Sequence, residues 1–174
     1  LTAERVAEKI TDKTKFVLFN TPSNPCGVVP SRGECAELRE LCKAKGVLLI
    51  SDEIYDLFTY REGRDSRGRA PSAAQHSEDV LLIRGFGKNY GCTGWRLGFA
   101  AGPSWLIHEM SKFQQYSFVC APSMAQHGVV GAHRLDMSPR VEAYERKRDR
   151  VVEILSPLTE VAVPQGAFYA FPRV

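Results

Sequence analysis

Several features that would place the chain at once in a well-defined class are missing from it. There is no Cys-x-x-Cys pair, and five cysteines, an odd number, disfavour both a disulfide framework and a zinc site. No apolar run approaches the roughly 18 residues of a membrane span, and no signal peptide opens the sequence. Charge of one sign is also lacking, since 23 basic residues face 20 acidic ones and the basic ones are dispersed. We therefore expect a soluble, cytoplasmic protein that binds neither nucleic acid nor membrane.

Two phosphate-binding glycine motifs are also missing. The stretch LLIRGFGKNYGCTGWRLGF, residues 81–99, sets Lys88 between glycines. The motif G-x-x-x-x-G-K-[ST] requires a glycine at position 82 and a hydroxyl residue at 89, where the chain has Leu82 and Asn89. Tyr90 stands where the dinucleotide pattern G-x-G-x-x-G needs its third glycine. Lys88 therefore needs another explanation.

Hydrophobic patterning predicts an α/β fold. Short apolar, β-branched runs alternate with longer stretches of helical period, which is typical of a mainly parallel sheet between two layers of helices. The runs look apolar enough to be buried on both faces, as central parallel strands are. The predicted strands are residues 15–20, 46–51, 80–85 and 96–102, and the predicted helices are 31–46, 104–116, 122–135 and 138–155.

The helix predicted after position 30 has recognisable ends. Ser31 and Glu34 have the spacing of a capping box, and Gly46 can close the C-terminus. Cys35 and Cys42 fall on its inner face, where we interpret them as small apolar residues rather than metal ligands. The polar segment 61–79 predicts a surface loop with at most one short helix, and the charges between 140 and 150 predict a solvated helix face.

Polar side chains follow the first three predicted strands. Asn24, Asp52 with Tyr55, and Lys88 come after successive strands, and Arg96 opens the fourth. Each has an ordinary explanation when taken alone, such as a turn, a helix cap or an exposed charge. Ligands of open α/β sheets bind beyond the carboxyl ends of the strands, however, so together these residues predict a binding site.

The same motifs resemble the fold type I pyridoxal-phosphate enzymes, and within them the class I and II aminotransferases. That family shows N-P-x-G after one strand, D-E-x-Y after the next, then S-x-S-K, followed eight residues later by the arginine of R-x-G. The corresponding segments here are NPCG, DEIY, GFGK and WRLG. Two longer segments, TGWRLGF and GAFYAFP, also resemble sequences of the family. The resemblance runs over nearly the whole chain.

The resemblance implies a role for each of these residues toward pyridoxal 5′-phosphate. The Lys88 amine condenses with the cofactor aldehyde and later moves a proton on the substrate. Asp52 keeps the pyridine nitrogen protonated, and Tyr55 and Asn24 bond the ring's 3′ oxygen. The remaining implied contacts are Ile54 against the ring face and Arg96 on the phosphate.

The sequence departs from the family pattern at two glycines. Gly85 and Gly87 stand where the family has serines in and near the phosphate site, so two hydroxyl donors are gone. If only hydroxyls are lost, restoring serine at both positions should tighten cofactor binding. If the glycines instead hold positive φ angles, serine should weaken it.

The chain begins without methionine and ends within a sequence pattern typical of a β-strand, so we expect a fragment of a longer polypeptide. By resemblance, residues 1–137 form the C-terminal part of a cofactor-binding large domain, and 138–174 form a connector helix and the beginning of a small α+β domain, with strands in LTEVAVP and GAFYAFPRV. The other phosphate-binding turn and the arginine for the substrate carboxylate then lie outside the chain.

Three functions are compatible with these motifs. The first is transfer of an amino group between an α-amino acid and an α-keto acid by a homodimer. The second is another reaction of the same cofactor, as in C-S lyases or aminocyclopropane-carboxylate synthases. The third is a non-catalytic domain of this fold, which the missing serines favour and the retained Lys88 disfavours. The four histidines are scattered, and none is assigned a role.

Overall fold

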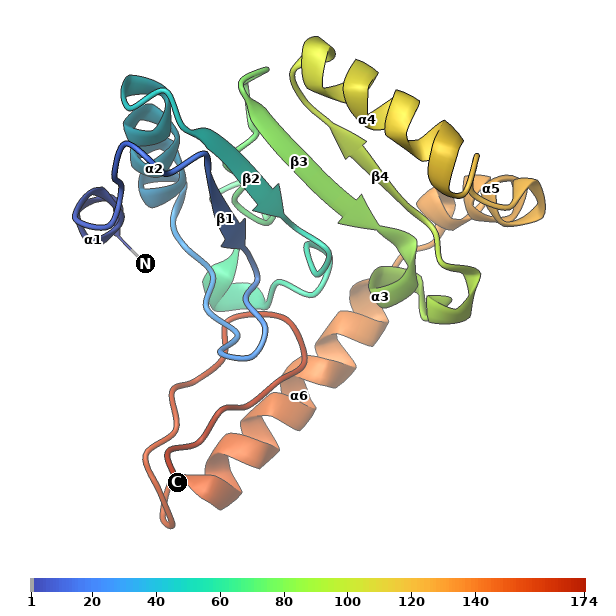
Figure 1. Ribbon diagram of the computed structural model, residues 1–174. Coiled ribbons are helices and arrows are strands. Elements are labelled where there is room, and N and C mark those ends of the chain that lie inside the picture. The colour runs from blue at the N-terminus through green and yellow to red at the C-terminus, as the bar shows by residue number, and fades with distance from the viewer. Residues whose placement is uncertain (1) are drawn as a thin grey trace.

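Four strands form one mixed sheet in the computed structural model of the chain (Figure 1). The structure describes residues 2–174, so Leu1, the first residue of the expected large-domain part, lies outside the described residues. The sheet order is β1-β2-β3-β4, with β1–β2 and β2–β3 parallel and β3–β4 antiparallel. The predicted α/β fold with a mainly parallel sheet is confirmed. The strands are β1 (Phe16–Asn20), β2 (Leu48–Asp52), β3 (Val80–Gly85) and β4 (Gly98–Ala101).

The expected burial of all four strands is wrong at both edges of this sheet. In β4 no residue is buried, and the strand runs antiparallel. Phe16 and Leu18 of β1 are 55% and 61% exposed. An edge strand has a neighbour on one side only, and short apolar runs do not reveal which strands lie at the edges.

The main core lies between the sheet and the helices α1 (Ala3–Ala7) and α2 (Arg32–Ala44). The predicted capping box is confirmed, with Ser31 Oγ accepting from Glu34 N at 3.2 Å and Glu34 Oε2 accepting from Ser31 N at 2.7 Å. Gly46 follows the helix with φ +64°. Cys35 and Cys42 are buried against the sheet, and burial, assisted by the charge of Glu53, raises the pKa of the Cys35 thiol to about 12.

The helices α4 (Ser104–Ser117), α5 (Ser123–Val130) and α6 (Ser138–Leu155) follow the prediction closely, with one exception. The two five-residue helices, α1 and α3 (Phe86–Tyr90), were not predicted. The expected helix 122–135 is too long, because α5 ends before Gly131 and only a single 3-10 turn, Ala132–Arg134, follows. Segment 61–79 is a loop with one short 3-10 helix, Arg61–Gly63, as predicted. Within residues 2–174, no helix is long and apolar enough to cross a membrane.

The C-terminal part departs from two expectations. The charged face of α6 is exposed at Arg140, Arg146, Lys147 and Arg150, as predicted, but Arg148 is buried. The segments LTEVAVP and GAFYAFPRV do not form regular strands. They meet at one isolated antiparallel bridge between Val161 and Pro172, and Gly166 bridges separately to Thr59. Pro164 and Pro172 have no backbone N–H, so neither can donate to a longer ladder.

Candidate active site

The loops after β1 and β2 and the helix after β3 meet at the carboxyl edge of the three parallel strands. The register sets this edge, because Asn20 at the end of β1 pairs with Asp52 at the end of β2, and Asp52 pairs with Ile83 of β3. Asn20 Nδ2 and Thr21 N both donate to the Asp52 carbonyl, at 3.1 and 2.9 Å, which ties the first two loops together. The predicted site residues are distributed around this edge.

Tyr55 is the centre of the cluster. Its side chain is buried, and its hydroxyl lies 2.6 Å from the hydroxyl of Tyr169. Burial raises the pKa of the Tyr55 phenol above its usual range. The Tyr169 hydrogen bond and the charge of Asp52 act in the same direction, and hydrogen bonding by Asn24 opposes them. Asn24, Asp52 and Tyr55 are therefore close together, as predicted, and Tyr55 keeps its proton at neutral pH.

Asp52 differs from the other carboxylates of its loop. Glu53 and Asp56 share the guanidinium of Arg84, with N–O distances of 2.7 and 3.2 Å. Asp52 forms no ion pair within residues 2–174, and its Oδ1 accepts only the Ile54 N–H at 3.2 Å. A half-buried carboxylate without a cationic partner is free to accept a hydrogen bond from a ligand.

Lys88 lies on α3, and its amine is 6.0 Å from the centre of the Phe168 ring. Phe168 in turn packs edge-on against Tyr55, with ring centres 5.1 Å apart. The next residue, Asn89, is buried and donates from Nδ2 to Asp56 Oδ1 at 2.6 Å. This hydrogen bond fixes the helix of Lys88 to the loop that carries Asp52 and Tyr55.

Arg96 is the most peripheral of the predicted residues. It is exposed, lies ahead of β4 rather than within it, and donates from Nη1 to Thr93 O at 3.1 Å. Its backbone has φ 51°, an uncommon angle for a residue with a side chain. Thr93 also lies next to Gly87, so Arg96 and the helix of Lys88 share a neighbour.

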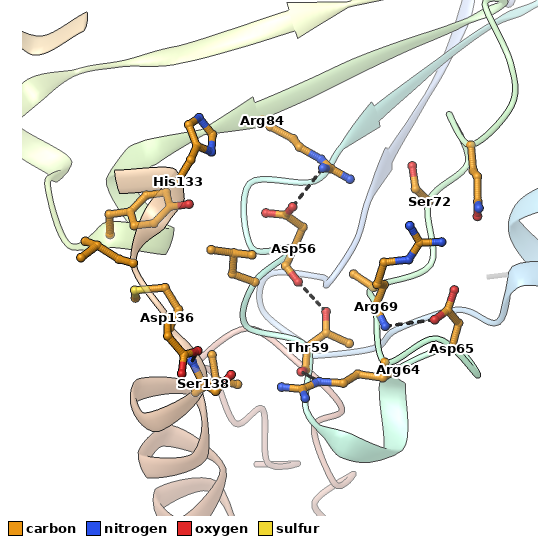
Figure 2. Close-up of a pocket in the computed structure, with 18 of the residues that line it drawn as sticks. Asp56, Thr59, Arg64, Asp65, Arg69, Ser72, Arg84, His133, Asp136 and Ser138 are labelled. Atoms are coloured by element: carbon orange, nitrogen blue, oxygen red, sulfur yellow. Dashed lines mark hydrogen bonds and ion pairs between the residues drawn. The ribbon is translucent and has the colours of Figure 1, made fainter. Parts of the chain in front are cut away.

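A cavity of about 720 Å³ lies elsewhere, beside Asp56, Arg84 and His133 (Figure 2). None of the predicted site residues lines it. Three of its lining side chains are arginines and three are aspartates, and Arg84 and Asp56 among them form an ion pair. The predicted residues gather instead around Tyr55, so the candidate site is that cluster.

Two parts of the cluster escaped the sequence analysis. Tyr169 and Phe168 belong to GAFYAFP, a segment that resembles the family but for which the sequence predicts no role. The Tyr169 hydroxyl lies within hydrogen-bond distance of Tyr55, and the Phe168 ring lies beside the Lys88 amine. The buried bonds of Glu53 with Arg84, Ser51 and Ser72 were not predicted either. The sequence feature that points to this network is Glu53, the second acidic residue of DEIY, directly after Asp52.

Comparison with known proteins agrees with the geometry. The family model "Aminotransferase class I and II" matches residues 1–174. The chain is 40% identical to the putative aminotransferase YugH of Bacillus subtilis, covering 99% of the chain and 45% of that protein. It is 37% identical to a probable aspartate aminotransferase of Methanocaldococcus jannaschii, covering 98% of the chain and 46% of that protein.

Solved structures give the same result. The aspartate aminotransferase from Rhizobium meliloti has a TM-score of 0.89 at 35% identity, covering 99% of this chain and 44% of that one. The aromatic aminotransferase from Pyrococcus horikoshii has a TM-score of 0.89 at 32% identity, covering 100% and 48%. The chain thus spans a little under half the length of the relatives it matches. With a match from its first residue to its last, it belongs to the class I and II aminotransferase family.

Proposed function

We propose that the whole protein containing this chain is an aminotransferase that moves an amino group between an α-amino acid and an α-keto acid. Class I and II aminotransferases depend on pyridoxal 5′-phosphate. The observation that supports the proposal is the meeting of Asn24, Asp52 and Tyr55 at one edge of the sheet, with Lys88 beside them.

The residues present fit this cofactor. Asp52 offers a half-buried carboxylate with no ion-pair partner in residues 2–174, which suits a protonated ring nitrogen. Tyr55 keeps its proton and can donate to a ring oxygen. Arg96 leaves most of its guanidinium free for a phosphate, since only Nη1 is engaged by Thr93. The carboxylate of Asp52 and the guanidinium of Arg96 thus have charges opposite to those of a protonated ring nitrogen and a phosphate, and the neutral Tyr55 hydroxyl is a hydrogen-bond donor for the ring oxygen.

The chain's own groups then have distinct tasks. When bound, the cofactor supplies an electron sink for the substrate α-carbon. Lys88 would provide the amine that holds the cofactor and a base able to move a proton at the substrate α-carbon. Asp52 would favour a proton on the ring nitrogen, and Ile54 would present an apolar surface to the ring. Tyr55 and Asn24, which lie close together, would orient the ring oxygen.

Reductive trapping tests the proposal. Borohydride treatment of the whole protein, followed by peptide mapping, should place the cofactor label on Lys88 alone. A Lys88→Ala variant should lose the label, and Lys112→Arg, which changes an exposed lysine paired with Glu109, should keep it. A label on another lysine, or none in the folded protein, contradicts the assignment.

We also propose the wider context that the resemblance implies. Residues 1–137 belong to a cofactor-binding large domain, and residues 138–174 form the connector and the beginning of a smaller domain. The whole protein acts as a homodimer in the cytoplasm. Support comes from α6, which leads away from the sheet as a connector helix would (Figure 1).

A further inference from the structure

We propose that Tyr169 is a positioning residue for the cofactor, acting through the hydroxyl of Tyr55. This inference rests on the proposed function, because it concerns how Tyr55 meets a ring oxygen. The two phenol oxygens lie 2.6 Å apart, within the usual range of an O–H···O hydrogen bond, and the rings meet edge-on with centres 5.6 Å apart. Nothing in the motifs assigned to the cofactor includes Tyr169.

The segment that carries Tyr169 is fixed at its base. We call residues 164–169 the tail segment. Gln165 N and Gly166 N both donate to Gly27 O in the loop after β1, at 2.8 and 3.0 Å. Ala167 N donates to Phe58 O at 2.8 Å, and the Tyr60 hydroxyl donates to Ala167 O at 2.6 Å. The tail segment is therefore bonded to the loops after both β1 and β2.

Close packing restricts this base further. A Cβ atom on Gly166 would lie 2.7 Å from Pro22 Cβ and 2.8 Å from Phe58 O. One on Gly27, whose φ is +66°, would lie 2.5 Å from Pro164 Cβ. None of these three distances is compatible with a Cβ atom, so only glycine fits at these two positions without a shift of its neighbours. Tyr169 thus lies two residues beyond Ala167, the last anchored residue of this base.

The position of Tyr169 determines what Tyr55 can do. Tyr55 has one hydroxyl proton, and if it is to donate that proton to a ligand oxygen, its own oxygen is left to accept. Either hydroxyl can donate to the other in the structure, where burial and donation by Tyr55 both raise the Tyr55 pKa. Once a ligand oxygen accepts the Tyr55 proton, Tyr169 becomes the donor, giving a chain from Tyr169 through Tyr55 to the ligand. Successive hydrogen bonds polarise one another, so the Tyr169 hydroxyl makes Tyr55 a stronger donor. The other groups that face the Tyr55 hydroxyl are Asp52 and Asn24, while the Lys88 amine lies over Phe168.

The experiment is an absorbance pH titration of the cofactor–lysine chromophore in the whole protein, without substrate. A weaker donor at Tyr55 favours the protonated chromophore, because the ring oxygen's negative charge is less stabilised. Tyr169→Phe keeps the ring and removes the hydroxyl. We expect the midpoint to rise by about half a unit to one unit, in line with the loss of one ordinary hydrogen bond.

Three comparisons make the result decisive. The Tyr144 ring contacts Phe58 and Phe168 in the same aromatic cluster. Tyr144→Phe removes a hydroxyl from this cluster and should leave the midpoint unchanged. Tyr55→Phe should raise the midpoint further than Tyr169→Phe. Tyr169→Leu should shift the midpoint as much as Tyr169→Phe does if the hydroxyl is responsible. If one of these two variants fails to fold, the other still reports the loss of the hydroxyl.

The outcomes separate the inference from the proposed function. A shift with Tyr55→Phe but none with Tyr169→Phe overturns the role of Tyr169 and leaves the function intact. A shift with Tyr144→Phe equal to that of Tyr169→Phe, or one that follows loss of the ring rather than of the hydroxyl, also overturns it. If the wild-type protein forms no chromophore at all, the proposed function itself fails.

Discussion

Gly85 and Gly87 stand where the family pattern has serines, and the structure removes one of the two explanations offered for them. Gly85 is extended, with φ −151° and ψ 160°, and Gly87 lies within α3, so neither has a positive φ. Space is limiting instead. A Cβ on Gly85 would lie 2.3 Å from Ile54 Cδ1, and one on Gly87 would lie 3.1 Å from Thr93 Cα. Glycine at position 85 therefore has two effects. It removes the hydroxyl that a serine would supply, and it leaves space for the Ile54 side chain.

We expect Gly85→Ser to lower the stability of the protein rather than to tighten cofactor binding. The new side chain must displace the Cδ1 end of the half-buried Ile54 side chain, which is free to rotate, so we expect a cost of about 1 kcal/mol or less, at the low end of overpacking. Ile54→Val removes the Cδ1 atom and should recover most of that loss in the double variant. Thermal midpoints and cofactor titrations of the four proteins in this cycle measure both effects. Tighter binding by Gly85→Ser alone, with no help from Ile54→Val, would show that the hydroxyl dominates.

The sequence predicted which residues of the candidate site lie close together better than it predicted their environments. Asn24, Asp52 and Tyr55 follow strands whose order and parallel direction bring their ends together, so their proximity could be inferred from the pattern of elements. The crowding of Gly85 by Ile54 could not, because residues 31 positions apart in the chain meet only through side-chain packing. Tyr169 was missed for the same reason, since its partner Tyr55 lies 114 residues away.

Among the elements, α6 shows most clearly how a charge pattern can mislead. Arg148 is buried, its Nη1 donates to Pro164 O at 2.5 Å, and its Nη2 lies 3.3 Å from Glu62 Oε1. Its guanidinium also lies 4.9 Å from the centre of the Tyr60 ring. Alternating charges predict a solvated face only while nothing packs on that face, and here the tail segment and the loop at Glu62 cover it. The position of α6 was predictable, and the burial of one arginine on it was not.

Removing this arginine should loosen α6 and the tail segment together. Arg148→Ala leaves the buried Pro164 carbonyl without its donor and should lower the free energy of unfolding by roughly 2 to 3 kcal/mol. Arg150→Ala, which breaks an exposed pair with Glu153 on the same helix, should cost about 0.5 kcal/mol or less. Chemical denaturation of the whole protein compares them, and equal costs would mean that the Arg148 contacts contribute no more than a surface pair.

On the scale of the whole molecule, large apolar side chains remain uncovered. Trp105, Phe113 and Tyr116 of α4 are 65%, 76% and 92% exposed, and both edge strands carry exposed aromatic residues. Exposed apolar surface of this kind marks a place where other protein packs. The chain spans less than half the length of its relatives. In the longer, dimeric protein proposed above, further polypeptide or a second subunit would cover this surface.

We expect the whole protein to be an active homodimer. Sedimentation over a range of protein concentrations, paired with activity measured at the same concentrations, checks this directly. The 174-residue chain produced alone should instead bind a hydrophobic dye and associate non-specifically, because its edge strands and α4 are open. Full activity in a species that sediments as a monomer would contradict the dimer.

The hydrogen bonds that anchor the tail segment to Gly27, Phe58 and Tyr60 also govern when the site can form. The related contact from Val29 N to Gln165 Oε1 spans 136 positions of the chain. On the ribosome, the β1 and β2 loops emerge long before residue 165 has been synthesised, and closing so long a loop carries an entropic cost that only the completed contacts offset. The sheet can therefore assemble during translation, whereas the environment of Tyr55 is completed only after nearly all of these 174 residues have been made, and a nascent chain stalled before that point would present Tyr55 without its partner.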